Sequence, residues 1–183
     1  MPVIISLLRG INVGGHKPIK MDALCEVYNA IGLGNVRSYL QSGNVVSTAK
    51  SHTLKRLTEQ IEDEIERKFE FRCGVILRTL SELKQVIADN PFAKRRGIEP
   101  GKLGVVFFKE APAVEKCKDV LGTKSEDEEV HINGREFYIY FGNGMGQSKL
   151  FAVIARKLTS GTTRNWNTVT KLAEIAERLE ASN

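Results

Sequence analysis

The sequence predicts a mixed α+β fold made of two tandem ferredoxin-like (split βαβ) modules, the second degenerate, followed by a C-terminal helix. In the first half, apolar runs and helical periodicities alternate in the order strand, helix, strand, strand, helix, strand, which is the split βαβ arrangement. The second half restarts this order and stops one strand short. The halves share no clear sequence similarity, so the repeat is one of topology.

The first half contributes six elements, each with its own signal. A continuous apolar run at the start is typical of a central strand covered on at least one face. Glycines end the first helical pattern, and a tight Ser42-Gly43 turn separates the next two strands. The second helix has one apolar and one charged face. The expected strands are residues 3–8, 36–40, 44–48 and 73–78, and the expected helices are residues 20–32 and 52–69.

The second half follows a short helix and a basic segment. Thr79 and Glu82 have the spacing of a capping box for that helix. Asn133-Gly134 predicts a type I′ hairpin, and Ser148 is a suitable N-cap. The expected helices are residues 81–89, 113–121, 148–159 and about 167–181, and the expected strands are residues 103–109, 129–132 and 136–141.

These elements define the expected organisation of the chain. The first ferredoxin-like module covers residues 1–80, and a helix with a basic linker covers residues 81–102. The second, degenerate module covers residues 103–160, and a C-terminal motif and helix cover residues 161–183. We expect all of them to form one compact unit.

The composition is that of a globular protein with a mild positive charge. The chain has 183 residues and a formal net charge of +5, which permits an anionic partner without demanding one. No stretch approaches the roughly 20 apolar residues that span a bilayer. The apolar run at residues 3–8 is too short for a signal-peptide core, and the first basic residue follows it. We therefore expect a cytoplasmic protein.

Cysteine and histidine usage predicts no metal and no cofactor. The three cysteines, Cys25, Cys73 and Cys117, are far apart, odd in number and outside any CxxC, so we expect buried free thiols. The three histidines, His16, His52 and His131, lack metal-type spacing with each other or with cysteine. No nucleophile motif of the GxSxG type is present either.

Two polar, glycine-bearing turns form a candidate site. They are Arg9-Gly10-Ile11-Asn12-Val13-Gly14-Gly15 and Gln41-Ser42-Gly43-Asn44. A right-handed crossover would make the second strand parallel to the first, so both turns should meet at one edge of the sheet. Ligands of open α/β sheets bind beyond the carboxyl ends of strands, a rule applied here by analogy because this sheet is largely antiparallel.

The first turn has the chemistry of an anion site. Glycine-rich backbone that leaves a strand and feeds a helix can present N–H groups to a phosphate, and Arg9 and Lys17 would add positive charge. The turn matches neither GxGxxG nor GxxxxGK[ST]. The alternative is a tight turn that needs positive φ at Gly14 and Gly15. A charge directly after a buried strand is costly, which favours a role for Arg9.

The second turn offers hydrogen bonds rather than charge. The amides of Gln41 and Asn44 and the hydroxyl of Ser42 suit recognition of a polar ligand. A plain hairpin turn explains the same residues equally well.

A third motif, Thr162-Thr163-Arg164-Asn165-Trp166-Asn167-Thr168, precedes the last helix. A threonine or asparagine would cap that helix, whose N-terminus attracts anions. Arg164 would then hold a phosphate and Trp166 would stack on a base or ring. The alternative is that Trp166 fills the core and Arg164 pairs with an acid.

Two other segments have simpler interpretations. Lys94-Arg95-Arg96 with Lys102 is the densest basic cluster, and a solvated linker is its usual explanation, with nucleic-acid contact as the alternative. The glycine-rich residues 142–149 are expected to be a flexible connection, with anion binding as the alternative.

The chain resembles a bacterial family of unknown function, domain of unknown function 1697. The segments that carry the resemblance are residues 8–15, 39–46 and 163–172, supported by Asn90-Pro91-Phe92 and residues 133–138. The resemblance covers nearly the whole chain and implies the two ferredoxin-like units. It implies no activity, so the function must be inferred from the chemistry of the residues.

The function that we expect is binding of a phosphate-bearing ligand, a nucleotide or RNA, without a membrane or metal partner. Arg9, Lys17 and Arg164 would neutralise phosphate, and Trp166 would stack. The expected site residues are Arg9, Gly10, Asn12, Gly14, Gly15, Lys17, Gln41, Ser42, Asn44, Arg164, Asn165, Trp166 and Asn167. One alternative is an enzyme that acts through electrostatic stabilisation without a recognisable nucleophile. The other is a protein–protein interaction module in which the motifs serve only the fold.

Overall fold

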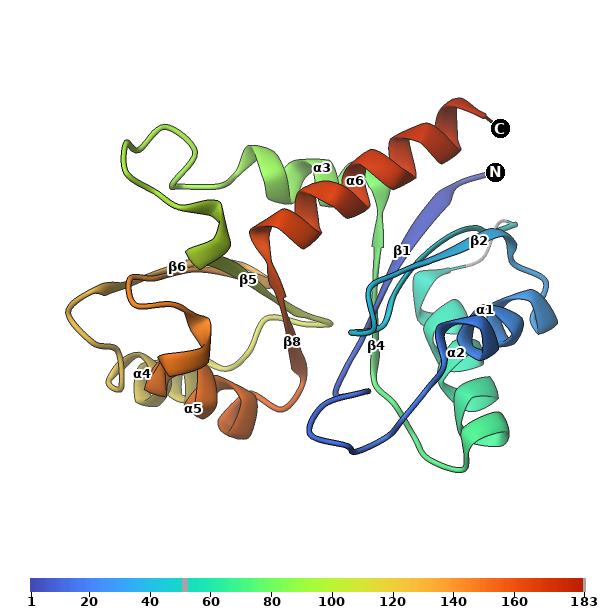
Figure 1. The fold of residues 1–183 in the computed structure, drawn as a ribbon, viewed down its shortest axis with the longest axis horizontal. Coiled ribbons are helices and arrows are strands. Elements are labelled where there is room, and N and C mark those ends of the chain that lie inside the picture. Colours follow the sequence, from blue (N-terminus) through green and yellow to red (C-terminus); the bar gives the residue numbers. More distant parts are fainter. Residues whose placement is uncertain (51–52, 183) are drawn as a thin grey trace. The chain divides into compact units, whose positions relative to one another are not determined.

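A computed structural model describes residues 1–50 and 53–182 (Figure 1). The chain divides into two compact units. Met1–Lys84 together with Lys171–Asn183 form the first, and Gln85–Thr170 form the second. Each unit contains one four-stranded antiparallel sheet with helices, so the fold is mixed α+β.

The sheet of the first unit is built around the apolar run at the start of the chain. Its strands are β1 (Val3–Leu8), β2 (Gly34–Tyr39), β3 (Asn44–Thr48) and β4 (Val75–Thr79). They lie in the order β2-β3-β1-β4, and every neighbouring pair is antiparallel. All six residues of β1 are buried, which confirms the prediction of a central strand.

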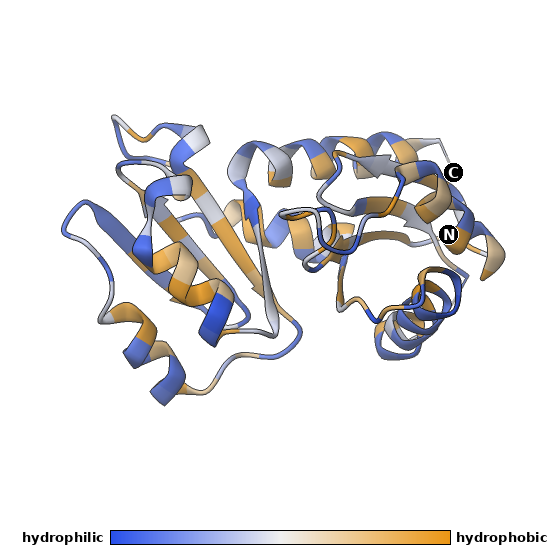
Figure 2. Ribbon diagram, turned by 60° about the horizontal axis from the view of Figure 1, so that its bottom comes forward, coloured by the Kyte–Doolittle hydropathy of each residue, from blue (hydrophilic) through white to orange (hydrophobic). Residues whose placement is uncertain are grey.

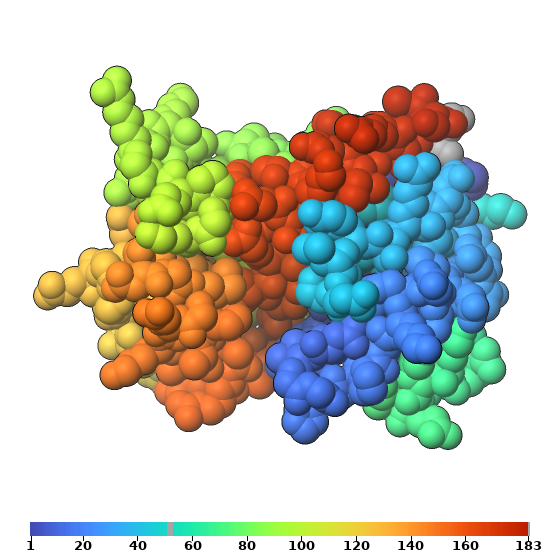
Figure 3. All heavy atoms as spheres, viewed as in Figure 1, coloured from blue at the N-terminus to red at the C-terminus, as the bar shows by residue number. Residues whose placement is uncertain are grey.

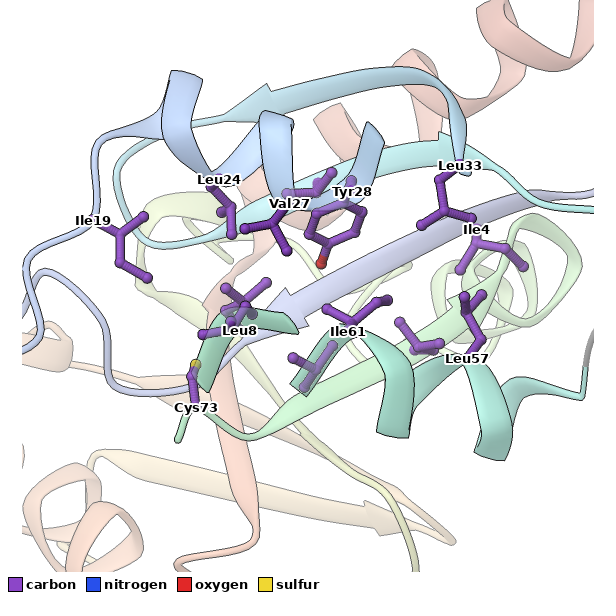
Figure 4. Close-up of a cluster of buried hydrophobic side chains, with 14 of the residues drawn as sticks. Ile4, Leu8, Ile19, Leu24, Val27, Tyr28, Leu33, Leu57, Ile61 and Cys73 are labelled. Atoms are coloured by element: carbon purple, nitrogen blue, oxygen red, sulfur yellow. The ribbon is translucent and has the colours of Figure 1, made fainter. Parts of the chain in front are cut away.

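Two helices cover one face of this sheet. They are α1 (Met21–Ala30) and α2 (Leu54–Phe69), and residue 52, where a helix was expected to begin, lies outside the described residues. Leu24 and Val27 of α1 and Ile61 of α2 point towards Ile4 and Leu8 of β1 (Figure 4). This layer of apolar side chains is the core of the first unit.

Tyr28 places a hydroxyl in that core. The residue is 0 % exposed, and its Oη has no hydrogen-bond partner within the described protein. Burial raises the pKa of the Tyr28 phenol, and the nearby Ser6 offsets part of this rise. The phenol therefore stays neutral.

We expect Tyr28→Phe to change the free energy of unfolding by less than about 0.5 kcal/mol, because a desolvated hydroxyl without a partner contributes little. Tyr138→Phe is the matched control, since the Tyr138 Oη donates to the Val86 carbonyl oxygen at 2.8 Å. The control should lose about 1 kcal/mol. Chemical denaturation of both variants measures the difference, and equal losses would show that Tyr28 also has a partner.

The sheet of the second unit repeats the strand order of the first sheet. Its strands are β5 (Leu103–Phe108), β6 (Glu128–Asn133), β7 (Glu136–Phe141) and β8 (Gly161–Asn165), in the order β6-β7-β5-β8. The helices α4 (Val114–Leu121) and α5 (Lys149–Lys157) contribute Val120, Leu150 and Ile154 to its core. In Figure 2 the sheet of this unit contains both hydrophobic and hydrophilic strands, and its helices also mix hydrophobic and hydrophilic residues.

The expectation that the second unit lacks its last strand is wrong. β8 pairs with β5 from Gly104↔Asn165 to Phe108↔Gly161. The sequence of β8, GTTRN, contains no apolar residue, so hydrophobic periodicity gives no strand signal there. Backbone pairing with β5 at the edge of the sheet stabilises β8 instead.

The predicted hairpin after β6 forms with a different turn. Its connecting residues are Gly134 and Arg135, and of these only Gly134 has positive φ, at 58°. A type I′ turn needs positive φ at both central positions, so the type I′ prediction is wrong. The cap predicted for α5 is confirmed, because Ser148 Oγ accepts from the Phe151 N–H at 2.9 Å.

Each unit's last strand leads directly into a helix at an equivalent position. β4 continues into α3 (Leu80–Ala88), and β8 continues into α6 (Trp166–Ala181). Thr79 and Glu82 form the predicted capping box, with hydrogen bonds of 3.1 and 2.8 Å. The internal repeat thus includes a closing helix in both halves, and α3 is the counterpart of the C-terminal helix.

A buried arginine marks the same register position in both units. Arg78 of β4 lies opposite Ile5, and Arg164 of β8 lies opposite Val105. Each guanidinium donates from Nη1 to the carbonyl oxygen of the preceding residue at 2.9 Å. Arg164 therefore has a structural counterpart within the chain.

Candidate functional site

The two glycine-bearing turns of the first unit meet at one edge of its sheet, as predicted from topology. The Asn12 Nδ2 donates to the Gln41 carbonyl oxygen at 2.7 Å, and the Leu8 N–H donates to the Gly43 carbonyl oxygen at 2.8 Å. In the space-filling view, the cyan atoms of the β2–β3 segment lie against the blue atoms of the β1–α1 connection (Figure 3). Segments 29 residues apart thus form one surface.

Asn12 holds this junction together through its side-chain amide. Its Nδ2 also donates to the Ile19 carbonyl oxygen at 3.0 Å, and its Oδ1 accepts from the Ile19 N–H at 2.8 Å. Both amide hydrogens and one oxygen lone pair are therefore used within the protein. Asn12 thus positions the turns relative to each other, and its expected contact with a ligand stays a prediction.

We expect Asn12→Ala to lower the free energy of unfolding by about 2–3 kcal/mol, because three hydrogen bonds to backbone groups are lost together. Asn12→Asp keeps the acceptor for the Ile19 N–H and loses both donors, so it should also destabilise the fold. Urea denaturation measures both losses. A loss below about 0.5 kcal/mol for Asn12→Ala would contradict the assignment of Asn12 as the clamp.

The residues after Asn12 form a small projecting hairpin. Val13 and His16 form a β-bridge across Gly14 and Gly15, whose φ values of 58° and 78° fit a type I′ turn. Lys17 closes the hairpin, since its carbonyl oxygen accepts from the Asn12 N–H at 3.2 Å. The glycines are therefore required by the turn, which is the structural alternative considered for them.

Lys17 and Arg9 lie beside the connection between α2 and β4. The Lys17 ammonium donates to the Arg72 carbonyl oxygen at 2.9 Å and stands 5.4 Å from the centre of the Phe71 ring. Arg9 is half-buried, and its N–H donates to the Gly74 carbonyl oxygen at 2.9 Å. Neither side chain is in the lining of the pocket described below.

The β2–β3 turn comprises residues 40–43 rather than Ser42-Gly43 alone. Asn44 is 0 % exposed and closes the turn, because its Nδ2 donates to the Tyr39 carbonyl oxygen at 2.8 Å and to Ser42 Oγ at 3.0 Å. The side chain of Asn44 is thus part of the hairpin, and its expected contact with a ligand stays a prediction. Gln41 remains exposed and uses only its backbone oxygen to hold Asn12.

An open pocket of about 690 Å³ lies where the turns meet the start of α1. Its lining residues are Asn12, Pro18, Ile19, Lys20, Met21, Asp22 and Gln41. Lys20 is the N-cap of α1 and forms no side-chain cap bond, so the first N–H groups of the helix have no side-chain acceptor there. The pocket combines an ammonium, a carboxylate, an amide and a helix N-terminus.

Sequence reasoning missed five of these seven lining residues. From the sequence, Lys20, Met21 and Asp22 were assigned only to the start of a helix. That assignment was also the available signal, because a helix N-terminus is itself able to bind an anion. Of the expected site residues, Asn12 and Gln41 are in the pocket, and Arg9 and Lys17 are not.

The third motif belongs to the second unit, where much of it is structural. Arg164 is 6 % exposed and donates to Thr162 Oγ1 at 2.8 Å. Asn165 caps α6 by accepting from the Asn167 N–H at 2.9 Å, and its Nδ2 donates to the Gly101 carbonyl oxygen at 2.8 Å. Trp166 is half-buried at the first position of α6, and Asn167 is exposed.

The other polar segments of the second unit are held by internal contacts. Arg95 pairs with Glu129 through two hydrogen bonds of 2.6 and 2.9 Å and stacks on Phe92, so the basic segment is anchored rather than free. Residues 142–149 border a smaller pocket of about 290 Å³. There, the buried Glu128 accepts from Ser148 Oγ and from the Ser125 N–H, so its two oxygens are both engaged.

Two further properties bear on partners. None of the helices in the described part of the chain is both long and apolar enough to cross a membrane. Within residues 1–50 and 53–182, no three His, Cys, Asp or Glu side chains gather as a metal site would require. Cys73 and Cys117 are buried free thiols as expected, whereas Cys25 is only half-buried.

Comparison with known proteins assigns the chain to a family. The family model described as "Protein of unknown function (DUF1697)" matches residues 1–138. The chain belongs to the DUF1697 family. The match includes both turns of the junction, and the third motif lies beyond it.

This DUF1697 protein also has a structural relative. It is similar to the conserved bacterial protein SP0830 from Streptococcus pneumoniae, at 21 % identity and a TM-score of 0.72, with 96 % of this chain and 98 % of that chain covered. At this identity the likeness concerns the fold alone. No curated protein matches the chain.

The two units of this DUF1697 protein differ at the connections that border the pocket. Residues 9–20, twelve in all, connect β1 to α1, whereas the equivalent connection from β5 to α4 is made by five, residues 109–113. The β2–β3 turn has four residues, and the β6–β7 turn has two. The same arrangement of strands and helices therefore forms without the additions that shape the pocket.

Proposed function

We propose that this DUF1697 protein binds a phosphate-bearing ligand, a nucleotide unit that is either free or part of RNA, in the pocket between the two turns of the first unit. The observation that carries the proposal is the pocket itself, formed by chain additions that the second unit lacks. Its volume of about 690 Å³ suits a small ligand, since pockets for such ligands range over roughly 300–1,000 Å³.

The lining suits the parts of a nucleotide. The phosphate would lie at the N-terminus of α1 beside Lys20, where the helix dipole and the ammonium both favour negative charge. The carboxylate of Asp22 would accept a hydrogen bond from a ribose hydroxyl, and the amide of Gln41 would bind a polar edge. Asn12 would keep Gln41 and Ile19 in place.

Backbone strain supports a functional role for the same surface. Among the described residues, five non-glycine residues have positive φ. Three of them, Asn12, Lys17 and Leu40, lie in the β1–α1 connection and the β2–β3 turn. Left-handed backbone at non-glycine residues is unfavourable and is concentrated at functional sites.

The test is ligand binding at low salt, by thermal shift and calorimetry, with four nucleoside monophosphates, inorganic phosphate and a short single-stranded RNA. We expect a nucleotide to raise the melting temperature of the wild type. Lys20→Ala should weaken this binding about tenfold, as loss of one charge-assisted hydrogen bond does. Lys55→Ala is the matched control, since Lys55 is an exposed lysine of α2 outside the pocket.

The outcomes separate the possible functions. Binding of RNA alone would identify the polymer as the source of the nucleotide unit, and binding of monophosphates would identify free nucleotides. Equal weakening by Lys20→Ala and Lys55→Ala would mean non-specific attraction to a basic protein. If no compound binds, the proposal is wrong and a protein partner becomes the better explanation of the turns.

We also infer that both units are ferredoxin-like modules. The strand orders β2-β3-β1-β4 and β6-β7-β5-β8, with two helices packed on one face of the first sheet, support this assignment. A topology comparison on an experimental structure would test it, and a strand order other than these two would contradict it.

A further inference from the structure

The strand β6 has one open side in the sheet of the second unit. It is the outermost strand in the order β6-β7-β5-β8, so among the described residues only β7 pairs with it. The Phe108 N–H donates to the Arg135 carbonyl oxygen at 2.9 Å, so the odd-numbered residues of β7 bond to β5 and the even-numbered ones bond to β6. The partners of these even-numbered residues are the odd-numbered residues of β6. Val130 and Ile132 therefore direct their N–H and C=O groups to the open side.

The first unit protects the equivalent edge of its own sheet. β2 is an outermost strand, and its register with β3 shifts between Gly34 and Arg37, where Asn35 has a φ of 51°. Such a bulge prevents another strand from pairing along an edge. β6 instead pairs with β7 without a shift over all six residues, and its sequence, EEVHIN, contains neither proline nor lysine. The edge of β6 is thus regular enough to accept a further strand.

Apolar side chains accompany the open backbone groups of β6. Val130 packs against the core of the second unit, and Ile132, two residues further on the same face, is 46 % exposed. A strand that paired with this edge would cover Ile132 and continue the apolar layer of the core.

The two carboxylates of β6 are already engaged within the chain. Glu128 is buried and accepts from the Ser125 N–H and from Ser148 Oγ. Glu129 pairs with Arg95 through hydrogen bonds of 2.6 and 2.9 Å. The edge therefore favours an apolar, uncharged strand over a basic or an acidic peptide.

A second copy of β6 is such a strand. Antiparallel pairing around a two-fold axis at His131 would place Val130 opposite Ile132 of the other copy, and Glu129 opposite Asn133. Branched apolar side chains then meet on one face of the sheet, and no two carboxylates are opposed. Val130 and Ile132 of the two copies would exchange four backbone hydrogen bonds, so the edge is complementary to itself in shape and in charge.

We propose that this DUF1697 protein forms a reversible homodimer through β6, in which the sheets of two second units join into one continuous sheet. The proposal is independent of ligand binding in the first unit. Pairing over a few residues buries less than about 1,000 Å², so we expect a weak dimer with a dissociation constant on the order of 10 μM.

Sedimentation equilibrium between about 1 and 500 μM tests the dimer, and we expect the mass of the wild type to double over this range. Ile132→Pro removes an N–H that points away from β7, so the chain should still fold. Its dimer dissociation constant should rise about 100-fold, because two of the four hydrogen bonds between the copies are lost. Ser38→Pro is the matched control, since Ser38 has the same next-to-last position in β2, and it should dimerise like the wild type.

A cysteine at the proposed axis tests the register. The background is Cys25→Ser, which removes the half-buried thiol and leaves only the two buried ones. Oxidation should link His131→Cys to its own copy, because residues paired across the axis lie about 5 Å apart, within the range of a disulfide. Asn133→Cys should stay unlinked, because it would lie opposite Glu129.

Each result supports or overturns the proposal. A wild type that stays monomeric at 500 μM overturns it, and so does a dimer that Ile132→Pro leaves as tight as before. Equal loss of the dimer in both proline variants, or linkage at Asn133 without linkage at His131, would contradict the pairing through β6. Circular dichroism shows whether Ile132→Pro folds, and Ile132→Lys, which puts a charge on the edge, replaces it if it does not.

Discussion

Replacing Arg78 with alanine should lower the free energy of unfolding by about 3–5 kcal/mol, the largest loss that we expect from any single substitution. Arg78 is 1 % exposed and heads the fully buried side chains of the protein by volume. Its Nη1 donates to the Leu77 carbonyl oxygen at 2.9 Å. Alanine would leave a void, and it would remove the Arg78 donor from the Leu77 carbonyl oxygen. Both changes fall in β4, which pairs with the central strand β1.

Two further variants separate volume from hydrogen bonding at this position. Arg78→Met keeps most of the side-chain volume and removes the guanidinium, so we expect a smaller loss than for alanine, of at least about 1 kcal/mol. Arg164→Ala should destabilise the protein to a similar degree as Arg78→Ala, because the two arginines share one register position and one backbone hydrogen bond. Guanidinium denaturation followed by circular dichroism measures all three. An Arg78→Ala variant as stable as the wild type would refute the structural role.

Gly43→Ala should lower the free energy of unfolding by about 2–4 kcal/mol and abolish ligand binding in the pocket. A Cβ at Gly43 would stand 2.6 Å from Ile11 Cδ1 and 2.8 Å from Leu8 Cβ, which is closer than packed carbon atoms approach. The φ of 76° adds strain for any L side chain. The substitution therefore forces the two turns apart at the point where Leu8 donates to the Gly43 carbonyl oxygen.

Gly10→Ala is the control that isolates the close approach from the backbone strain. Gly10 also has positive φ, at 64°, but a Cβ there would meet nothing within 4 Å. We expect a loss of only about 1 kcal/mol for Gly10→Ala. Thermal unfolding of both variants, with and without the best-binding nucleotide, gives the comparison. Equal losses would mean that strain alone, and not contact between the turns, determines the effect.

Local signals in the sequence predicted most of the elements because each signal lies within the element that it predicts. The buried run of β1, the apolar stripe of α2, the capping box at Thr79 and the Ser148 cap are all contacts or periodicities over a few residues. The meeting of the two turns was also predicted, since the handedness of a crossover restricts the topology. A strand without apolar residues, β8, has no such local signal.

The roles of polar side chains depended on residues far away in the sequence. The sequence predicts Asn12 and Asn44 as ligand contacts, and it gives no sign that their amide groups bind the backbone of Ile19, Gln41 and Tyr39. Only their neighbours in space show that these hydrogen bonds are already made. The same reason explains why Lys20 and Asp22 were missed, since a pocket is formed by segments that the sequence keeps apart.

The sequence by itself determined the order of strands and helices apart from β8, the central position of β1 and the junction of the two glycine-bearing turns. Only the tertiary structure decided that β8 completes the second sheet, that Arg164 is a buried counterpart of Arg78, and that the pocket is lined by the start of α1. The division has a physical cause. Periodicity, capping and chain handedness act over short stretches of chain, whereas edge pairing, burial of charge and saturation of polar groups are set by partners that only folding brings together.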